Sequence, residues 1–257
     1  MPLYAIIEPM PVLPGIYQGK DDIIMIICGL QKTTLLDYPG HVAATIFLGN
    51  CNFRCPFCHN KEVVSLSSQW LESNSISEDE LFRFLQKRRG ILDGVCITGG
   101  EPTVQQGLED FIRRIREMGY QIKLDTNGYR PETINQLLNC QLLDYIAMDI
   151  KSSPARYPQV CGTAHLDIER IRASVSLIQS SGISYEFRTT VAREFQTEED
   201  FREIGLWLSG SAAYYLQPYR DCETLSGRHF HPYTKEEMDA FVSLLQKFIP
   251  NSCLRGI

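Results

Sequence analysis

Short runs of β-branched and aromatic residues alternate with helix-period segments along most of this chain. This alternation is typical of βαβ units, in which parallel strands form a sheet and the intervening helices cover it. Strands are predicted at residues 42–48, 94–98, 120–125, 143–150, 184–191 and 212–217. Helices are predicted near residues 77–89, 105–118, 131–138, 168–181, 198–209 and 234–248. We therefore expect an α/β fold built from six βα units.

Local signals support several of these helices. Ser77, with Glu80 three residues later, forms a capping-box pattern. Pro131 suits the first turn of a helix, where its missing N–H has no partner to lose. Gly119 and Gly182 follow predicted helices, as C-terminal capping glycines do.

The length of 257 residues fits one large α/β domain, which we expect to span residues 25–257. Residues 1–24 contain four prolines and lack the pattern of a signal peptide, so they are expected to form a poorly ordered N-terminal extension. Met25 is then a candidate for the natural start of the protein.

Charge and hydropathy argue against two classes of partner. The chain has 31 acidic and 25 basic residues, a formal net charge of −6, and no basic stripe that could follow a phosphate backbone. Nucleic acid is therefore not expected as a partner. No apolar run has the length of a membrane span, so membrane association is not expected either.

The segment CNFRCPFCHN carries the clearest chemical signal, because Cys51, Cys55 and Cys58 are separated by three and then two residues. Three thiolates can hold three irons of a [4Fe–4S] cluster and leave the fourth iron open to an exogenous ligand. The alternative is a zinc site with His59 as the fourth ligand. Adjacent residues such as Cys58 and His59 rarely reach one tetrahedral ion, and this favours the cluster.

The other six of the nine cysteines, Cys161 among them, are scattered and are interpreted as small apolar or incidental residues. An oxidising compartment would threaten a cluster with an open iron. A cytoplasmic location is therefore expected.

Polar residues gather where the predicted strands end, which is where parallel α/β folds bind their ligands. The residues that close or follow the six strands are Cys51, Cys55, Cys58, Gly99, Gly100, Glu101, Pro102, Asp125, Thr126, Asn127, Gly128, Asp149, Ile150, Lys151, Arg188, Gln217, Pro218, Tyr219 and Arg220. All six strands are thus predicted to point at one site.

The cysteine spacing and the segment ITGGEP at residues 97–102 resemble two motifs of the radical S-adenosylmethionine enzymes. One predicted helix and one predicted strand separate the two segments, as in that superfamily. The resemblance implies a partial (β/α)6 barrel with an open lateral face, bound S-adenosylmethionine, and one [4Fe–4S] cluster held by Cys51, Cys55 and Cys58.

Three further segments, CHN at 58–60, DTNG at 125–128 and MDIK at 148–151, resemble the activating enzymes of glycyl-radical proteins. The stretch at 29–51 is most similar to anaerobic ribonucleoside-triphosphate reductase activating proteins. No additional cysteine-rich insert follows the cysteine loop, which matches the short form of the activase without further clusters.

This resemblance implies a reaction and its partners. A flavodoxin- or ferredoxin-type reductant would reduce the cluster, and S-adenosylmethionine would be cleaved to methionine and a 5′-deoxyadenosyl radical. That radical would abstract a hydrogen atom from a glycine of a partner enzyme, with anaerobic ribonucleotide reductase as the first candidate. The protein would supply orientation and exclusion of water, and no side chain would act as an acid or base.

The resemblance also implies roles for single residues. Gly99 and Gly100 would let the backbone approach the cofactor, and Glu101 would pair with the cofactor ammonium group. The other interpretation of Glu101 is an acid in a surface turn. Arg188, among apolar neighbours on a strand, would contact the methionine carboxylate, with a structural salt bridge as the alternative.

Asp125, Thr126 and Asp149, with the carbonyl of Ala147, resemble the positions that hold a monovalent cation beside the cofactor in pyruvate formate-lyase activase. The alternatives are hydrogen bonds to the cofactor ribose and helix capping by Asp125.

Further contacts to the cofactor are expected from residues near these motifs. His59 and Asn60 follow the last cysteine and would line the pocket, although His59 could equally be a satisfied polar residue of the loop. Phe57 would lie near the adenine, and Asn127 belongs to the same segment as Asp125. Arg220 stands where a related activase has a cofactor-contacting histidine.

Asp37 and Lys151 are candidates for the substrate side of the site. Asp37 precedes Tyr-Pro-Gly, so ordinary turn chemistry explains it equally well. Lys151 has a similar status.

Two rival functions remain open from the sequence. One is a radical S-adenosylmethionine enzyme that acts on a small molecule, similar to carboxy-deazaguanine synthase. The other is a non-catalytic iron–sulfur or zinc protein.

Overall fold

The computed structural model describes residues 25–64, 66–221 and 223–256. The extension predicted at residues 1–24 lies outside the described residues. Among the described helices, none is both long and apolar enough to cross a membrane.

The described strands form one sheet in which each strand pairs with the next along the chain. They are β1 Ile27–Thr34, β2 Ala43–Leu48, β3 Gly94–Gly99, β4 Gln121–Thr126, β5 Tyr145–Asp149, β6 Ser184–Val191, β7 Tyr214–Pro218 and β8 Ser252–Leu254. Strands β2 to β7 are the six predicted ones, and they pair in parallel. The α/β interpretation of the sequence is confirmed.

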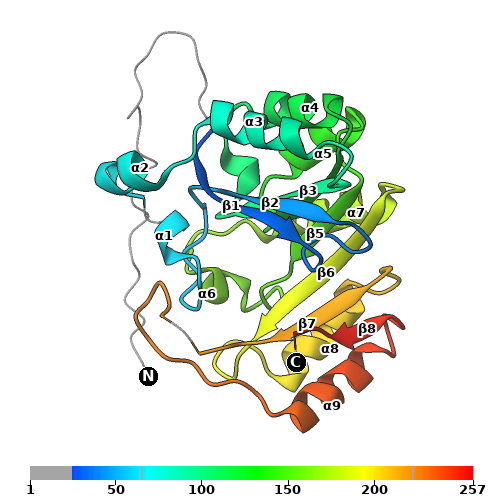
Figure 1. Ribbon diagram of the computed structural model, residues 1–257. Coiled ribbons are helices and arrows are strands. Elements are labelled where there is room, and N and C mark those ends of the chain that lie inside the picture. Colours follow the sequence, from blue (N-terminus) through cyan, green and yellow to red (C-terminus); the bar gives the residue numbers. More distant parts are fainter. Residues whose placement is uncertain (1–24, 65, 222, 257) are drawn as a thin grey trace.

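The helices lie outside the curved sheet (Figure 1). They are α1 Lys61–Val64, α2 Ser68–Asn74, α3 Glu78–Arg88, α4 Leu108–Glu117, α5 Pro131–Asn139, α6 Tyr157–Cys161, α7 Ile168–Ser180, α8 Glu198–Trp207 and α9 Lys235–Leu245, with a 3₁₀ turn at Pro102–Val104. Six of them, α3, α4, α5, α7, α8 and α9, are the predicted helices.

The predicted helix ends are also confirmed. The Ser77 hydroxyl accepts a hydrogen bond from the backbone N–H of Glu80 at the start of α3, which is one of the two bonds of the predicted capping box. Pro131 is the first residue of α5. Gly119 and Gly182 have φ angles of +95° and +77°, which glycine adopts more readily than any other residue.

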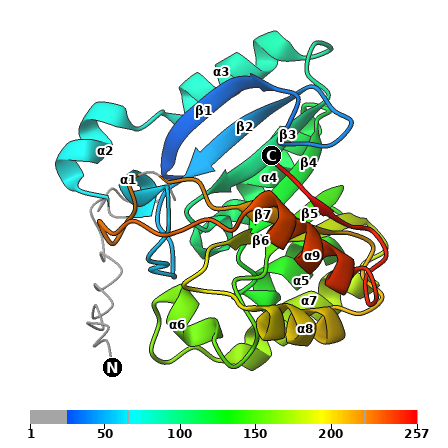
Figure 2. The same cartoon turned by 90° about the horizontal axis from the view of Figure 1, so that it is seen from below.

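The sheet does not close into a complete barrel. In the described part of the chain, β1 and β8 form its two edges and do not pair with each other. The view from below shows the sheet curving from β1 around to β7 (Figure 2). A partial barrel with an open lateral face, as the sequence implied, is therefore the fold.

Side-chain alternation along the strands separates an apolar outer layer from a polar inner wall. On β4, Ile122 and Leu124 belong to the buried apolar core, whereas Asp125 faces a cavity on the inner side. Lys123 shares the inner face with Asp125, because residues two apart on a strand point the same way. The fold thus places charged side chains inside the curved sheet.

Candidate functional site

A cavity of about 600 Å³ lies at the carboxyl ends of the strands, a size typical of small-molecule sites. It brings together all the side chains predicted to hold the cluster, to contact the cofactor or to face the substrate, except that of Arg220. The predicted residues that line it are Asp37, Cys51, Cys55, Phe57, Cys58, His59, Asn60, Gly99, Gly100, Glu101, Asp125, Thr126, Asn127, Asp149, Lys151 and Arg188.

Arg220 does not reach this cavity. Its side chain is exposed and donates a hydrogen bond of 2.6 Å to the carbonyl oxygen of Gly256. The structure therefore gives no support to the expectation that Arg220 contacts a cofactor, because the end of β7 turns its side chain toward the C-terminal segment.

The cysteine loop between β2 and α1 is held from two sides by segments distant in sequence. The backbone N–H of Arg54 donates to the carbonyl of Cys161 at the end of α6, over 2.9 Å. On the other side, the N–H of Leu225 donates to the carbonyl of Cys58 over 3.0 Å. The loop that carries the three thiols is thus fixed by the fold itself.

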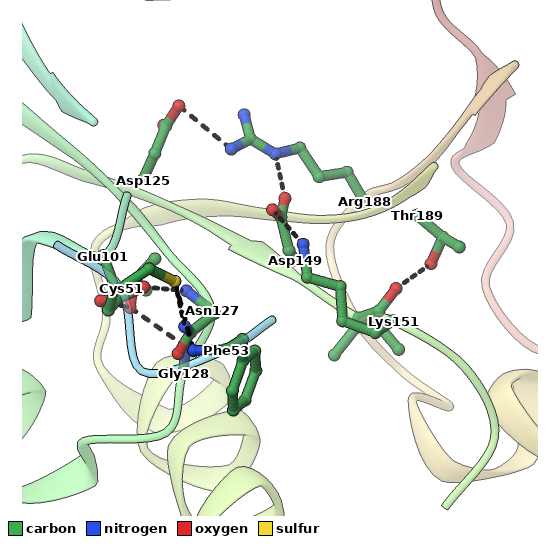
Figure 3. A network of polar contacts seen from close by, with 12 residues as sticks. Cys51, Phe53, Glu101, Asp125, Asn127, Gly128, Asp149, Lys151, Arg188 and Thr189 are labelled. Carbon is green, nitrogen blue, oxygen red and sulfur yellow. Dashed lines mark hydrogen bonds and ion pairs between the residues drawn. The ribbon is translucent and has the colours of Figure 1, made fainter. Parts of the chain in front are cut away.

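The Cys51 sulfur is surrounded by hydrogen-bond donors. The backbone N–H of Phe53 lies 3.4 Å from it and the side-chain amide of Asn127 lies 3.9 Å from it (Figure 3). Such donors stabilise a thiolate bound to iron and tune its cluster. Beside it, the Asn52 Nδ2 is a buried donor without a partner among the described residues, and a bound cluster or ligand would supply an acceptor.

The three thiols differ in their surroundings. Burial raises the pKa of Cys51 and Cys58, which are next to other anionic groups. A hydrogen bond from Cys161 lowers the pKa of the Cys55 thiol. Cys161 is itself fully buried, so this contact is shielded from water.

Three thiols that line one cavity form a donor set that suits an iron–sulfur cluster. Within the described residues, no group of three or more His, Cys, Asp or Glu side chains is arranged to hold a single metal ion. Beside the three cysteines, the cavity also has room for a small organic molecule.

Glu101 is buried, with only 1% of its surface exposed, so it is not an acid in a surface turn. Its Oε1 accepts hydrogen bonds from the Thr103 backbone N–H at 3.1 Å, the Thr103 hydroxyl, and the Thr126 hydroxyl at 2.7 Å. Its Oε2 accepts from the Asn127 backbone N–H at 2.6 Å. Burial raises the pKa of this carboxyl, although these donors oppose the change. Glu101 therefore connects the loop after β3 to the end of β4. A cofactor ammonium group that paired with Oε2 would share this oxygen with the Asn127 backbone N–H.

The two glycines before Glu101 have a packing reason to be glycine. Gly99 has a φ of +124°, and a Cβ there would lie 2.2 Å from the carbonyl oxygen of Leu48. A Cβ on Gly100 would lie 2.0 Å from the carbonyl oxygen of Asn50. Both positions therefore bring the loop after β3 against the end of β2, next to the cysteine loop.

A chain of ion pairs lies in the wall of the same cavity. Figure 3 shows Arg188 on β6 extending between Asp125 and Asp149. Its Nε lies 2.5 Å from Asp149 Oδ1, and one terminal nitrogen lies 3.0 Å from Asp125 Oδ2. Lys151 Nζ lies 2.8 Å from Asp149 Oδ2, and Lys123 pairs with Asp125 Oδ1. The structural salt bridge considered for Arg188 is therefore present.

The ion pairs set the charge states of this wall. Burial alone would raise the pKa of Asp149, but Arg188 and Lys151 more than offset this and hold it well below its usual range. The pKa of Asp125 is lowered in the same way by Arg188 and Lys123. Burial alone would lower the pKa of Lys151, but Asp149 raises it above its usual range. Both carboxyls are thus ionised at neutral pH.

These contacts do not fit the monovalent cation expected at Asp125, Thr126 and Asp149. All four carboxylate oxygens already face a lysine or arginine nitrogen. The Thr126 hydroxyl donates to Glu101 and accepts from the backbone N–H of Gly128 at 3.1 Å. The side-chain oxygens of Asp125, Thr126 and Asp149, which with the Ala147 carbonyl would bind a free cation, are occupied by the protein's own groups.

The remaining predicted residues form the rim. The Phe57 ring packs against Phe195 with centroids 4.9 Å apart. The Asn60 side chain donates to the Gly99 carbonyl oxygen at 3.2 Å. Asp37 accepts a hydrogen bond of 2.6 Å from Thr45, which directs its carboxylate into the barrel.

His59 lies on the exposed part of this rim. Its ring contacts that of Tyr219 edge-on, at a centroid distance of 5.5 Å. Partial burial lowers the pKa of the imidazole, so it is neutral at physiological pH.

The sequence did not predict every residue of the site, because Phe53, Val64, Thr98 and Thr190 also line the cavity. Two residues that contact the lining were missed as well. Lys123 was not predicted, although its spacing of two from Asp125 on a strand places both on one face. Cys161 was interpreted as incidental, because nothing in the sequence relates α6 to the cysteine loop more than one hundred residues earlier.

Comparison with known proteins agrees with the geometry. A family model for the radical SAM superfamily matches residues 45–208. A protein of Methanocaldococcus jannaschii, described as an inferred glycyl-radical enzyme activating enzyme, is 29% identical over 238 residues, or 90% of this chain and 96% of the relative. The 7-carboxy-7-deazaguanine synthase of Thermococcus kodakarensis is 26% identical over 190 residues, or 67% of this chain and 72% of that enzyme.

A solved structure shows the same fold. It is a domain of the pyruvate-formate lyase-activating enzyme of Bacteroides vulgatus, with a TM-score of 0.53 at 19% identity, covering 63% of this chain and 99% of that domain. The matched family segment spans more than half of the chain and includes the cysteine loop, Glu101 and the ion pairs, and this protein therefore belongs to the radical S-adenosylmethionine superfamily.

Proposed function

We propose that this protein is a glycyl-radical enzyme activating enzyme, and that its partner is an anaerobic ribonucleotide reductase. The observation that carries the proposal is the cavity whose wall combines three cysteines with the ion pairs of Arg188 and Lys151. The similarity over nearly the whole length of a relative described as such an activating enzyme supports it. The DTNG and MDIK segments support it as well, because both contribute side chains to this wall.

The residues around the cavity suit the two cofactors. Cys51, Cys55 and Cys58 would hold a [4Fe–4S] cluster, which when bound supplies the electron that cleaves S-adenosylmethionine. Arg188 and Lys151 bring a guanidinium and an ammonium group to the cavity, where both pair with Asp149. The carboxylate of the cofactor's methionine group would pair with one of these cations.

The open side of the barrel supports a macromolecular substrate. Strands β1 and β8 leave the sheet unclosed, and Asp37 brings a carboxylate to the cavity from the loop after β1. A glycine-bearing loop of another protein would have to enter such an opening. The reductant would be a flavodoxin- or ferredoxin-type protein.

Anaerobic reconstitution with iron and sulfide tests the chemistry. After reduction with dithionite, the loaded protein is expected to convert S-adenosylmethionine to 5′-deoxyadenosine, which mass spectrometry detects. Cys55→Ala should abolish the product, whereas Cys140→Ala should retain it, because Cys140 is exposed and outside the cavity. A fully loaded cluster that yields no product, with candidate partners present, would contradict the proposal.

A second candidate function is the conversion of a small heterocycle, and the similarity to 7-carboxy-7-deazaguanine synthase favours it. The two candidates differ in where the abstracted hydrogen comes from. An activase consumes one S-adenosylmethionine for each partner protein, whereas a small-molecule enzyme turns over many times and releases a second product. Quantifying 5′-deoxyadenosine against added partner therefore separates them.

A further inference from the structure

Lys123 is a buried charged residue that none of the assigned roles uses. Its side chain is 2% exposed and projects from β4 to the inner side of the barrel. Its ammonium group pairs with Asp125 Oδ1 and lies 3.8 Å from the Cys96 sulfur. The ring centroid of Tyr145 is 5.8 Å away. Lys123 is not part of the cavity lining, so it supports Asp125 from behind.

The ammonium group of Lys123 supplies a positive charge at the Asp125 carboxylate, as a bound cation would. Lys123 neutralises Asp125 on one side, while Arg188 bridges Asp125 and Asp149 on the other. Lys151 pairs with Asp149 Oδ2, the one carboxylate oxygen of the two aspartates that Lys123 and Arg188 do not contact. A free Na⁺ or K⁺ would have to displace one of these groups, because all four carboxylate oxygens of Asp125 and Asp149 already have a cationic partner.

We propose that the ammonium group of Lys123 is a built-in cation for Asp125, which Arg188 links to Asp149, so that cofactor binding requires no monovalent metal ion. The proposal rests on the proposed function in so far as the cofactor is S-adenosylmethionine. Lys123 is a positioning residue: it holds Asp125, and through Asp125 it fixes the Arg188 guanidinium at the cavity wall.

Cofactor affinity in different salts tests this role. The cluster-loaded protein is titrated with S-adenosylmethionine in KCl, NaCl or choline chloride at equal ionic strength, and binding is followed by the electron paramagnetic resonance of the reduced cluster. Choline is too large to replace an ion in the wall. Because the unchanged protein needs no such ion, its dissociation constants are expected to agree within about twofold in the three salts.

Variants of Lys123 make the test specific. Lys123→Ala removes the charge and leaves space, so its affinity is expected to fall by about tenfold or more in choline and to recover in KCl or NaCl. Lys123→Met removes the charge but fills the space, and it should be weakened in all three salts. Lys123→Arg keeps the charge and should retain salt-independent binding.

Two results would overturn the proposal. The first is a loss of affinity of about tenfold in the unchanged protein when choline replaces K⁺, because a metal ion would then be part of its site. The second is a Lys123→Ala variant whose affinity does not respond to the salt.

Thermal unfolding of the cluster-free protein gives a readout that does not depend on the cofactor. A ligand that binds only the folded state raises the unfolding midpoint. The midpoint of Lys123→Ala is expected to be higher in KCl than in choline chloride, whereas those of the unchanged protein and Lys123→Met should be equal in the two salts. If the unchanged protein binds no S-adenosylmethionine in any salt, the proposed function fails, and the melting response still decides the role of Lys123.

Discussion

At the scale of single residues, the site depends on polar groups that the fold has already paired. Asp125, Asp149 and Glu101 are held by cations or hydrogen-bond donors of the chain itself. Such preorganisation keeps the geometry in place before a ligand arrives. It also links the chemistry of the site to the stability of the protein.

Replacing Glu101 with Ala tests this link. The change leaves the buried Thr126 hydroxyl and the Asn127 N–H without their acceptor. We expect the free energy of unfolding of the cofactor-free protein to fall by about 3 kcal/mol, since each unsatisfied buried donor costs about 1–3 kcal/mol. Urea unfolding measures this, with the exposed Glu117→Ala as control. A Glu101 variant as stable as the control would show that the carboxylate serves only the cofactor.

The pH dependence of stability tests the ion pairs. Because the folded-state pKa of Asp149 is lowered, its stabilising contribution is present above the unfolded-state value of about 3.9 and is lost as the pH falls through the folded-state value. Asp149→Asn should therefore be less stable than the unchanged protein at pH 7, and the difference should shrink below about pH 4. Urea unfolding from pH 7 to pH 3 measures it.

The exposed Asp239 provides a matched control for this series, because it pairs with Lys235 on the surface of α9. Asp239→Asn should change the unfolding free energy little at any pH, as exposed ion pairs do. An Asp149→Asn variant that follows the same course as this control would refute the assignment of the stabilised carboxylate.

At the scale of elements, the six repeating βα units could be predicted from the sequence, whereas the strands and short helices outside this repeat could not. The six predicted strands match β2 to β7 because each is a buried run of β-branched and apolar residues. The antiparallel strand β1 was missed, since its second half, Gln31 to Thr33, is polar and exposed. Helix α6 is short and contains Pro158, and β8 has only three residues. Periodicity in the sequence is too weak to mark elements of this length.

The residues of the site could be predicted because they belong to the same repeating units. Its residues follow strands, and parallel strands end at one edge. Contacts from elsewhere could not be foreseen, because they depend on how α6 and the segment after β7 pack against the cysteine loop.

The packing of α6 against the cysteine loop gives an element-scale prediction. Gly162 ends α6 with a φ of +63°, and a Cβ there would lie 2.2 Å from the carbonyl oxygen of Arg54. Gly162→Ala should lower the free energy of unfolding by about 3 kcal/mol, from the left-handed backbone and the clash together. Gly182→Ala is the matched control, because its φ is +77° with nothing near the added Cβ, and it should cost only about 1–2 kcal/mol.

The same pair of variants separates stability from cluster retention. Iron content after reconstitution should fall in Gly162→Ala and not in Gly182→Ala, because only the former displaces the cysteine loop. Equal unfolding free energies and equal iron contents in the two variants would contradict the anchoring role of α6.

At the scale of the whole molecule, the main feature is a polar cavity in a barrel that stays open on one side. The open edges β1 and β8 and the superfamily assignment fit the activation of a large partner. The central claim is that the hydrogen atom abstracted in the reaction comes from a glycine of that partner.

Isotope transfer tests this claim most directly. Anaerobic ribonucleotide reductase carrying α-deuterated glycine is incubated with the reduced, cluster-loaded protein and S-adenosylmethionine, and the 5′-deoxyadenosine is analysed by mass spectrometry. We predict that one deuterium appears in 5′-deoxyadenosine together with a glycyl radical signal on the reductase. Unlabelled 5′-deoxyadenosine without a glycyl radical, formed at the same rate with and without the reductase, would contradict the account.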